Sequence, residues 1–267
     1  MLRTVLICHH DAPLHSDGMA RWLAAWSELT GIVELEESGA HLRRRLRRER
    51  RRVGLLRLAD IVAFRAYYAA RLAARDARTL AAILTDLRRR FPAVPESTPR
   101  LHAPGPNTPA VEDFIRSAAP DIVIALCKQI IKPAVFSIPR VGTFVLHPGI
   151  CPEYRNAHGC FWALASDDVG RVGMTLLRVD EGVDTGPVFG YFSYPFDESA
   201  ESHIVIQHRV VTENLDAIAQ RLMEIADGTA SPIPTNGRPS ASWGQPWLSA
   251  YLRWKRNARR RYARRGA

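Results

Sequence analysis

Short apolar runs alternate with helix-like patterns in the first half of the chain. Residues 4–10, TVLICHH, form an apolar run typical of a buried parallel strand, and apolar side chains recur with helical spacing over residues 17–29. Residues 31–37, GIVELEE, are a candidate for a second strand. The apolar runs at 120–127 and 142–149 are typical of central parallel strands. The pattern predicts an α/β fold with a mostly parallel sheet and helices on both faces.

A long segment between the predicted strands favours helix. Residues 53–91 contain no proline and are rich in alanine, leucine and arginine, which predicts two long helices. Residues 92–109 hold six prolines and are therefore predicted to be an irregular connector. Helix is expected again over residues 109–118, PAVEDFIRSA.

The second half predicts two antiparallel strands, over residues 170–182 and 184–196, and then one long helix over residues 199–228. The residues after Gly228 are rich in proline, serine, glycine and tryptophan, and predict a tail that wraps around the rest of the chain. We therefore expect one catalytic domain over 1–228, with a helical insertion at about 42–91, and a basic C-terminal tail over 229–267.

Composition indicates a globular chain. With 267 residues, of which 46% are hydrophobic, the chain is long enough to bury a full core. It contains no run of 18 apolar residues, and its N-terminal apolar stretch is too short for a signal peptide, so we expect no membrane span and a cytoplasmic location. The four cysteines show no CxxC spacing and are expected to remain thiols.

The net charge of +10 comes from two segments. Residues 43–52 hold eight arginines, residues 253–265 hold eight basic side chains, and the remaining residues carry 21 basic and 26 acidic side chains. Such runs can bind phosphates or anionic lipids, but no pattern of base-stacking aromatic residues accompanies them. A solvated charged helix or tail is the favoured interpretation.

A loop rich in reactive side chains follows the predicted strand at 142–149. His147 stands at the end of this strand, where open α/β sheets place ligands, and Asp184 lies in a turn between the two later strands. A carboxylate beside an imidazole orients the ring and raises its basicity, as an acid–base histidine requires. His147, Cys151, His158 and Cys160 are metal-ligand types, but their spacing matches no zinc pattern, so no metal is expected at the site.

Three ordered motifs at this point resemble one enzyme family. PDIVIALCKQIIKPAVFSIPRVG, HPGICPEYR and GRVGMTLLRVDEGVDTGPVF are similar to segments of the folate-dependent formyltransferases, which include the methionyl-tRNA, glycinamide ribonucleotide and sugar N-formyltransferases. The resemblance is close over about 120–190 and loose over 1–28. It implies a Rossmann-like sheet and transfer of a formyl group from 10-formyltetrahydrofolate to a primary amine.

The family's catalytic set is an Asn-x-His pair and a later Asp. The resemblance places His147 and Asp184 at two of these positions, whereas Val145 stands at the position of the asparagine. Attack of an amine on the formyl carbon creates an oxyanion, and an amide donor to it contributes about 2.7–4 kcal/mol. Asn156 is the preferred substitute donor, with His158 or a backbone N–H as alternatives. Asn156 stands where the family usually has glycine, so a left-handed turn residue is an equally weighted interpretation.

The resemblance also implies roles for the remaining residues. His147 would donate to the oxyanion as an imidazolium or act as the acid–base group for the amine, and Asp184 would hold the ring and accept the amine proton. The folate is expected to bind mainly main-chain groups of two segments, with walls formed by Leu126, Cys127, Ile130, Ile131, Val179 and Val183. Acceptor-binding residues are expected in the loop, namely Tyr154, Arg155 and His158.

The formyl acceptor is expected to be a small-molecule amine, such as an amino sugar or a specialised metabolite. A tRNA is disfavoured because the tRNA enzymes carry a further C-terminal barrel, whereas 39 residues follow Gly228. The glycinamide ribonucleotide enzymes lack the arginine-rich insertion, and a homo-oligomer is left open. Two alternatives remain: a hydrolase of 10-formyltetrahydrofolate, and a catalytically silent member that binds folate or a protein partner.

Overall fold

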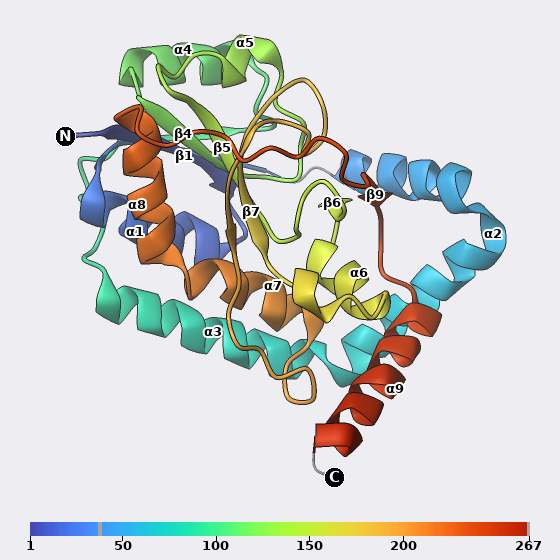
Figure 1. The fold of residues 1–267 in the computed structure, drawn as a ribbon. Helices are drawn as coiled ribbons and strands as arrows, with labels where there is room; N and C mark the ends of the chain where they lie inside the picture. The colour runs from blue at the N-terminus through green and yellow to red at the C-terminus, as the bar shows by residue number, and fades with distance from the viewer. Residues whose placement is uncertain (37–38, 266–267) are drawn as a thin grey trace.

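The computed structural model describes the backbone of residues 1–36 and 39–265 (Figure 1). In this part of the chain the main sheet has seven strands in the order β3-β2-β1-β4-β5-β7-β8. The first five of these are parallel, and β7 and β8 are antiparallel to their neighbours. The strands are β1 (Arg3–His9), β2 (Glu28–Leu35), β3 (Arg100–Ala103), β4 (Ile122–Leu126), β5 (Gly142–His147), β7 (Met174–Arg178) and β8 (Val188–Phe192). The expected Rossmann-like α/β fold is confirmed.

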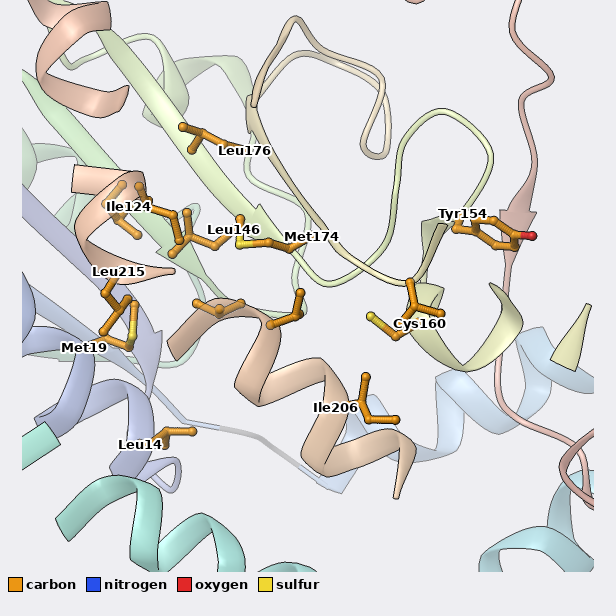
Figure 2. Packing of buried hydrophobic residues seen from close by; sticks show 14 of the residues in the cluster. Leu14, Met19, Ile124, Leu146, Tyr154, Cys160, Met174, Leu176, Ile206 and Leu215 are labelled. Carbon is orange, nitrogen blue, oxygen red and sulfur yellow. The ribbon is translucent and has the colours of Figure 1, made fainter. Parts of the chain in front are cut away.

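Helices cover both faces of the sheet (Figure 1). One face packs against α4 (Pro109–Ala118) and the short α5 (Pro133–Phe136), because side chains of one parity along each strand, such as Val5 and Val123, point to it. The other face packs against α1 (Ala20–Trp26), α7 (His203–Thr212) and α8 (Leu215–Ala226). Figure 2 shows this second layer, where Ile124, Leu146, Met174 and Leu176 from the strands lie over Ile206 and Leu215.

The segment expected to be a helical insertion, about 42–91, lies in α2 (Gly39–Arg71) and α3 (Ala73–Arg90). Helix α3 contacts a π-helical turn (Leu14–Met19) that follows β1 in the chain. Gly54, with a φ of 77°, interrupts α2, since this left-handed conformation is one that glycine adopts without strain. The side chains of the arginine run at 43–52 lie outside the described residues, so its interpretation as a solvated helix stays a prediction.

The C-terminal tail folds back onto the domain. It contributes a short strand, β9 (Ser242–Trp243), and ends in the basic helix α9 (Leu248–Arg265), which crosses α2 and packs on α6 (Gly159–Ala165) (Figure 1). Trp254 of α9 is fully buried in the same core cluster as the sheet. The domain boundary after residue 228 stays a prediction. Among the described helices, none combines the length and apolar composition needed to span a bilayer.

Three local predictions were wrong. The single helix expected over 199–228 is broken between α7 and α8, where the Asn214 side chain donates to the Ser193 and Val210 carbonyl oxygens at 3.1 and 2.9 Å. The proline-rich connector contains β3, because its backbone pairs with the edge of β2. Residues treated as loop form α6, which is buried along its whole length.

Candidate active site

His147 ends β5 and lies at the carboxyl edge of the parallel strands. Its side chain is only 6% exposed, and its Nε2 atom lies 2.8 Å from the Tyr154 carbonyl oxygen. Since side chains alternate along a strand, Val145 points to the same face of the sheet as His147. The side chains of residues 145 and 147 therefore lie on the same face of the sheet, as those of an Asn-x-His pair would.

Two glycines allow the loop after β5 to approach the histidine closely. A Cβ atom on Gly149 would lie 2.5 Å from the Tyr154 carbonyl oxygen and 2.8 Å from His147 Nε2, and one on Gly159 would lie 2.5 Å from the Cα atom of Gly149. A Cβ atom does not approach other non-bonded heavy atoms that closely in stable structures, so neither position accommodates a side chain without displacement of the loop. The His147 ring is thus held by close backbone packing.

Asp184 comes from the segment that joins β7 and β8. Its Oδ2 atom lies 3.5 Å from His147 Nδ1, and the carboxylate is only 13% exposed. The same Oδ2 atom accepts the backbone N–H of Asn156 at 2.7 Å. Asp180 fixes this segment, because its Oδ1 atom accepts from the Gly182 N–H at 3.0 Å and the Thr185 hydroxyl at 2.8 Å. The expected proximity of His147 and Asp184 is present, although they are 37 positions apart in the sequence.

The contacts of His147 distinguish its two ring nitrogens. A carbonyl oxygen cannot donate, so the hydrogen between His147 and Tyr154 belongs to Nε2. Nδ1 is then the nitrogen available for chemistry, and a proton on it makes the contact with Asp184 attractive. The pair can hold a proton at Nδ1 and accept one at the Asp184 carboxylate.

Asn156 is held by the C-terminal tail. It has a φ of 75° and lies in the two-residue strand β6 (Arg155–Asn156), which pairs with β9. Its side-chain amide donates to the Trp243 carbonyl oxygen at 2.6 Å. The Trp243 ring stacks on Trp162 with centroids 4.7 Å apart and on Tyr154 at 5.9 Å. The tail thereby fixes the backbone N–H of Asn156 that reaches Asp184.

The other loop residues that sequence analysis selected point in different directions. Tyr154 is buried, its ring points away from the sheet (Figure 2), and its hydroxyl donates to Asp168 Oδ2 at 2.9 Å. Burial and the Asp168 carboxylate both raise the pKa of Tyr154. Arg155 lies beside the Asp184 segment, where its guanidinium donates to the Val183 carbonyl oxygen at 2.8 Å. The His158 ring faces His203, with centroids 5.9 Å apart.

The residues predicted to line a folate site lie in two segments. Ile130, after β4, and Val183, beside Asp184, are exposed large apolar side chains. Leu126, Cys127 and Val179 are half-buried and Ile131 is buried. Burial raises the pKa of Cys127 to about 11, which keeps it a thiol. The loop after β4 is held by Asn107, whose amide donates to the Ile130 carbonyl oxygen at 2.8 Å and accepts from the Lys132 N–H at 2.7 Å.

Sequence reasoning missed two residues that support the loop. Thr175 is fully buried opposite His147 in the β5–β7 register, donates to the Gly149 carbonyl oxygen at 2.7 Å and accepts from the Cys151 N–H at 2.9 Å. A threonine inside an apolar strand pattern was the available signal. Trp243 had no such signal, because its contact with Asn156 spans 87 residues.

The comparison with protein families agrees with this geometry. A family model described as formyl transferase matches residues 80–222, which is more than half of the 267 residues. The chain belongs to this family. Formyltransferases of this family take the formyl group from 10-formyltetrahydrofolate.

Individual relatives share parts of the chain. A methionyl-tRNA formyltransferase of Pelobacter propionicus is 29% identical over 154 residues, which are 56% of this chain and 47% of that protein. The human mitochondrial 10-formyltetrahydrofolate dehydrogenase is 26% identical over 162 residues, 60% of this chain and 17% of that protein. The chain thus spans at most about half the length of these relatives. A sugar N-formyltransferase structure from Shewanella sp. superposes with a TM-score of 0.53 at 13% identity, covering 91% of this chain and 77% of that one, which shows a shared fold.

Proposed function

We propose that this formyltransferase moves the formyl group of 10-formyltetrahydrofolate to the primary amine of a small molecule, such as an amino sugar or a specialised metabolite. The observation that carries the proposal is the contact of His147 Nδ1 with Asp184 Oδ2 at 3.5 Å, at the carboxyl edge of the sheet. Family membership gives the reaction class.

Exposed apolar side chains support the proposal that the two segments bind a folate. Ile130 and Val183 offer exposed apolar side chains, which in water-facing loops are typical of surfaces that a ligand covers. When bound, 10-formyltetrahydrofolate would supply an activated formyl group. The segments implied by the family resemblance, Leu126 to Ile131 and Val179 to Asp184, would hold it.

We assign different roles to the His147 ring and the Asp184 carboxylate. The Nδ1–H of protonated His147, which is 3.5 Å from Asp184 Oδ2 and so not held in a short hydrogen bond, would donate to the oxyanion that amine attack creates, a role that preorganised donors fill in acyl-transfer sites. Asp184 would orient the ring and accept the proton of the attacking amine. Asn156 acts in this proposal chiefly through its backbone N–H, which fixes the Asp184 carboxylate.

The burial of His147 and Asp184 favours a small acceptor. The His147 and Asp184 side chains are 6% and 13% exposed, so a slender amine reaches them more readily than a bulky group. Arg155, which donates to the Val183 carbonyl oxygen, would bind a carboxylate or phosphate of the acceptor. The methionyl-tRNA formyltransferases among the relatives share only about half their length with this chain, so their acceptor is not transferred to it.

The test is to incubate the protein with 10-formyltetrahydrofolate and a pool of amine metabolites and to search by mass spectrometry for products heavier by CO. His147→Ala and Asp184→Ala should each lower the rate by about 10²–10⁴, the effect of losing a positioned acid–base group. Asp113→Ala, at an exposed position on α4, is the matched control and should leave the rate unchanged. Full activity of either active-site variant would refute the role given to that residue.

Hydrolysis of 10-formyltetrahydrofolate is a second candidate, because the same two catalytic side chains would serve when no amine is bound. Water would then replace the amine at the same His147–Asp184 pair. Formate release without any acceptor would identify this activity. Folate binding with neither transfer nor hydrolysis would instead support the silent-member alternative.

A further inference from the structure

Three metal-ligand side chains meet at a place that sequence analysis did not select. His10 directly follows β1, Glu34 is on β2, and His102 is on β3, and these three strands are neighbours in the sheet. Glu34 is in register with Cys8 of β1 and with His102 of β3. Because side chains alternate along strands, His10, Glu34 and His102 all project to the same face of the sheet.

The ligand atoms are close enough to share one ion. His10 Nδ1 lies 2.8 Å from Glu34 Oε2, and His102 Nε2 lies 3.5 Å from the same oxygen. One ligand atom from each residue falls within 4.8 Å of the others. With metal–ligand distances of about 2.0–2.1 Å, tetrahedral zinc requires ligand atoms about 3.3–3.4 Å apart, so only small side-chain adjustments are needed.

Hydrogen bonds from neighbouring side chains orient the Glu34 carboxylate. The Glu34 side chain is 6% exposed and accepts hydrogen bonds from His10 and Arg100. Arg100 donates to Oε1, which leaves Oε2 directed at the two imidazoles. Metal-binding carboxylates are typically oriented by such an outer hydrogen bond, although the positive charge of Arg100 opposes a cation.

We propose that His10, Glu34 and His102 bind one divalent first-row transition-metal ion, with Zn²⁺ the ion that fits the ligand set best. Two imidazoles and one carboxylate are a known zinc set, and three protein ligands leave at least one position for water or an oxygen of a bound molecule. Both imidazoles are largely exposed, so an ion has a direct path from solvent. The ends of β1 and β5 are separated by β4, which places His10 about 10 Å or more from His147. The metal proposal rests on these three side chains alone, and its test does not depend on the formyl-transfer proposal.

The experiment is a titration of untagged, EDTA-treated protein, with Zn²⁺ followed by calorimetry and Co²⁺ followed by its visible absorption. One ion per chain is expected. His10→Ala, His102→Ala and Glu34→Gln should each weaken binding on the order of tenfold or more, since even outer-shell changes at metal sites have effects of 10–100-fold. Glu36→Gln, at an exposed position on the same stretch of chain, and His147→Ala, which removes the active-site imidazole, should bind as the parent does.

Thermal denaturation in EDTA checks that each variant is folded, and added Zn²⁺ should raise the melting temperature of the parent but not of the three ligand variants. The proposal is overturned if the parent binds no stoichiometric ion. It is equally overturned if the three ligand variants bind like the parent, or if His147→Ala alone abolishes binding.

Discussion

Replacement of Asn156 by glycine and by alanine separates two roles of this residue. Asn156 has a φ of 75°, its amide donates to the Trp243 carbonyl oxygen at 2.6 Å, and its backbone N–H donates to Asp184 at 2.7 Å. Glycine retains the backbone conformation and the N–H group but removes the amide. Alanine also removes the amide, but it is strained at this φ.

The stability costs of the two variants differ by a predictable amount. Loss of the exposed hydrogen bond to Trp243 costs about 0.5–1.5 kcal/mol in both variants. Alanine in the left-handed region adds about 1–2 kcal/mol, whereas glycine adds none. We expect Asn156→Ala to lose about 2–3 kcal/mol and Asn156→Gly about 1 kcal/mol. For a chain of this size, the alanine variant should melt roughly 4–12 °C lower than the parent.

The turnover number distinguishes the two mechanisms. If the backbone N–H matters, as proposed, Asn156→Gly should keep kcat within about threefold of the parent, a change of about 0.6 kcal/mol. If the side-chain amide is the oxyanion donor, both variants should lose about 10²–10³ in kcat with unchanged folate affinity. Measurement of kcat at saturating donor, with urea unfolding of each variant, gives both quantities. A hundredfold loss in the glycine variant would refute the backbone role.

Three further changes test the packing and chemistry around the site. Gly149→Ala would place a Cβ atom 2.5 Å from the Tyr154 carbonyl oxygen, so it should lower the free energy of unfolding by about 1–3 kcal/mol and kcat at least tenfold. Gly170→Ala, whose Cβ would meet no atom within 4 Å, should change neither quantity. Equal urea midpoints and rates for the two variants would contradict this prediction. Burial holds the pKa of His203 well below its ordinary value near 6.5, so only the unfolded state gains this proton as pH falls and stability is lost below about pH 6.5. His203→Phe should therefore reduce the difference in unfolding free energy between pH 7.5 and pH 5 by about 2 kcal/mol, and an unchanged difference would exclude His203 as its source. Val145→Asn restores the family's amide and should raise kcat, by up to about 10²–10³ if the amide reaches the oxyanion; no rise in a folded variant would show that this position does not face it.

The sequence determined the elements whose signal is local. The apolar runs at 4–10, 120–127 and 142–149 predicted β1, β4 and β5, because strands buried on both faces must be apolar throughout. The motif resemblance gave the family and placed His147 and Asp184, which the structure brings to 3.5 Å. These features depend on short segments, so one sequence was enough to find them.

Other features depend on which segments meet in space. Strand β3 forms in a proline-rich stretch because its backbone pairs with the edge strand β2. The helix expected over 199–228 breaks at Asn214, whose side chain donates to the Ser193 carbonyl oxygen. The contact of Asn156 with Trp243 likewise joins segments 87 residues apart. The periodicity of apolar residues predicts which side of a helix or strand is buried. It does not predict which distant backbone groups form hydrogen bonds with its polar groups.

The cluster of His10, Glu34 and His102 likewise depends on which segments meet in the folded chain. The three residues come from separate segments, so they lack the close mutual spacing that makes a metal motif visible in a sequence. Parallel pairing of β1, β2 and β3 places Glu34 beside Cys8 and His102, and so brings the three ligand atoms within 4.8 Å of one another. Strand register is set by packing over the whole sheet, and for this reason only the tertiary structure could decide that these side chains meet.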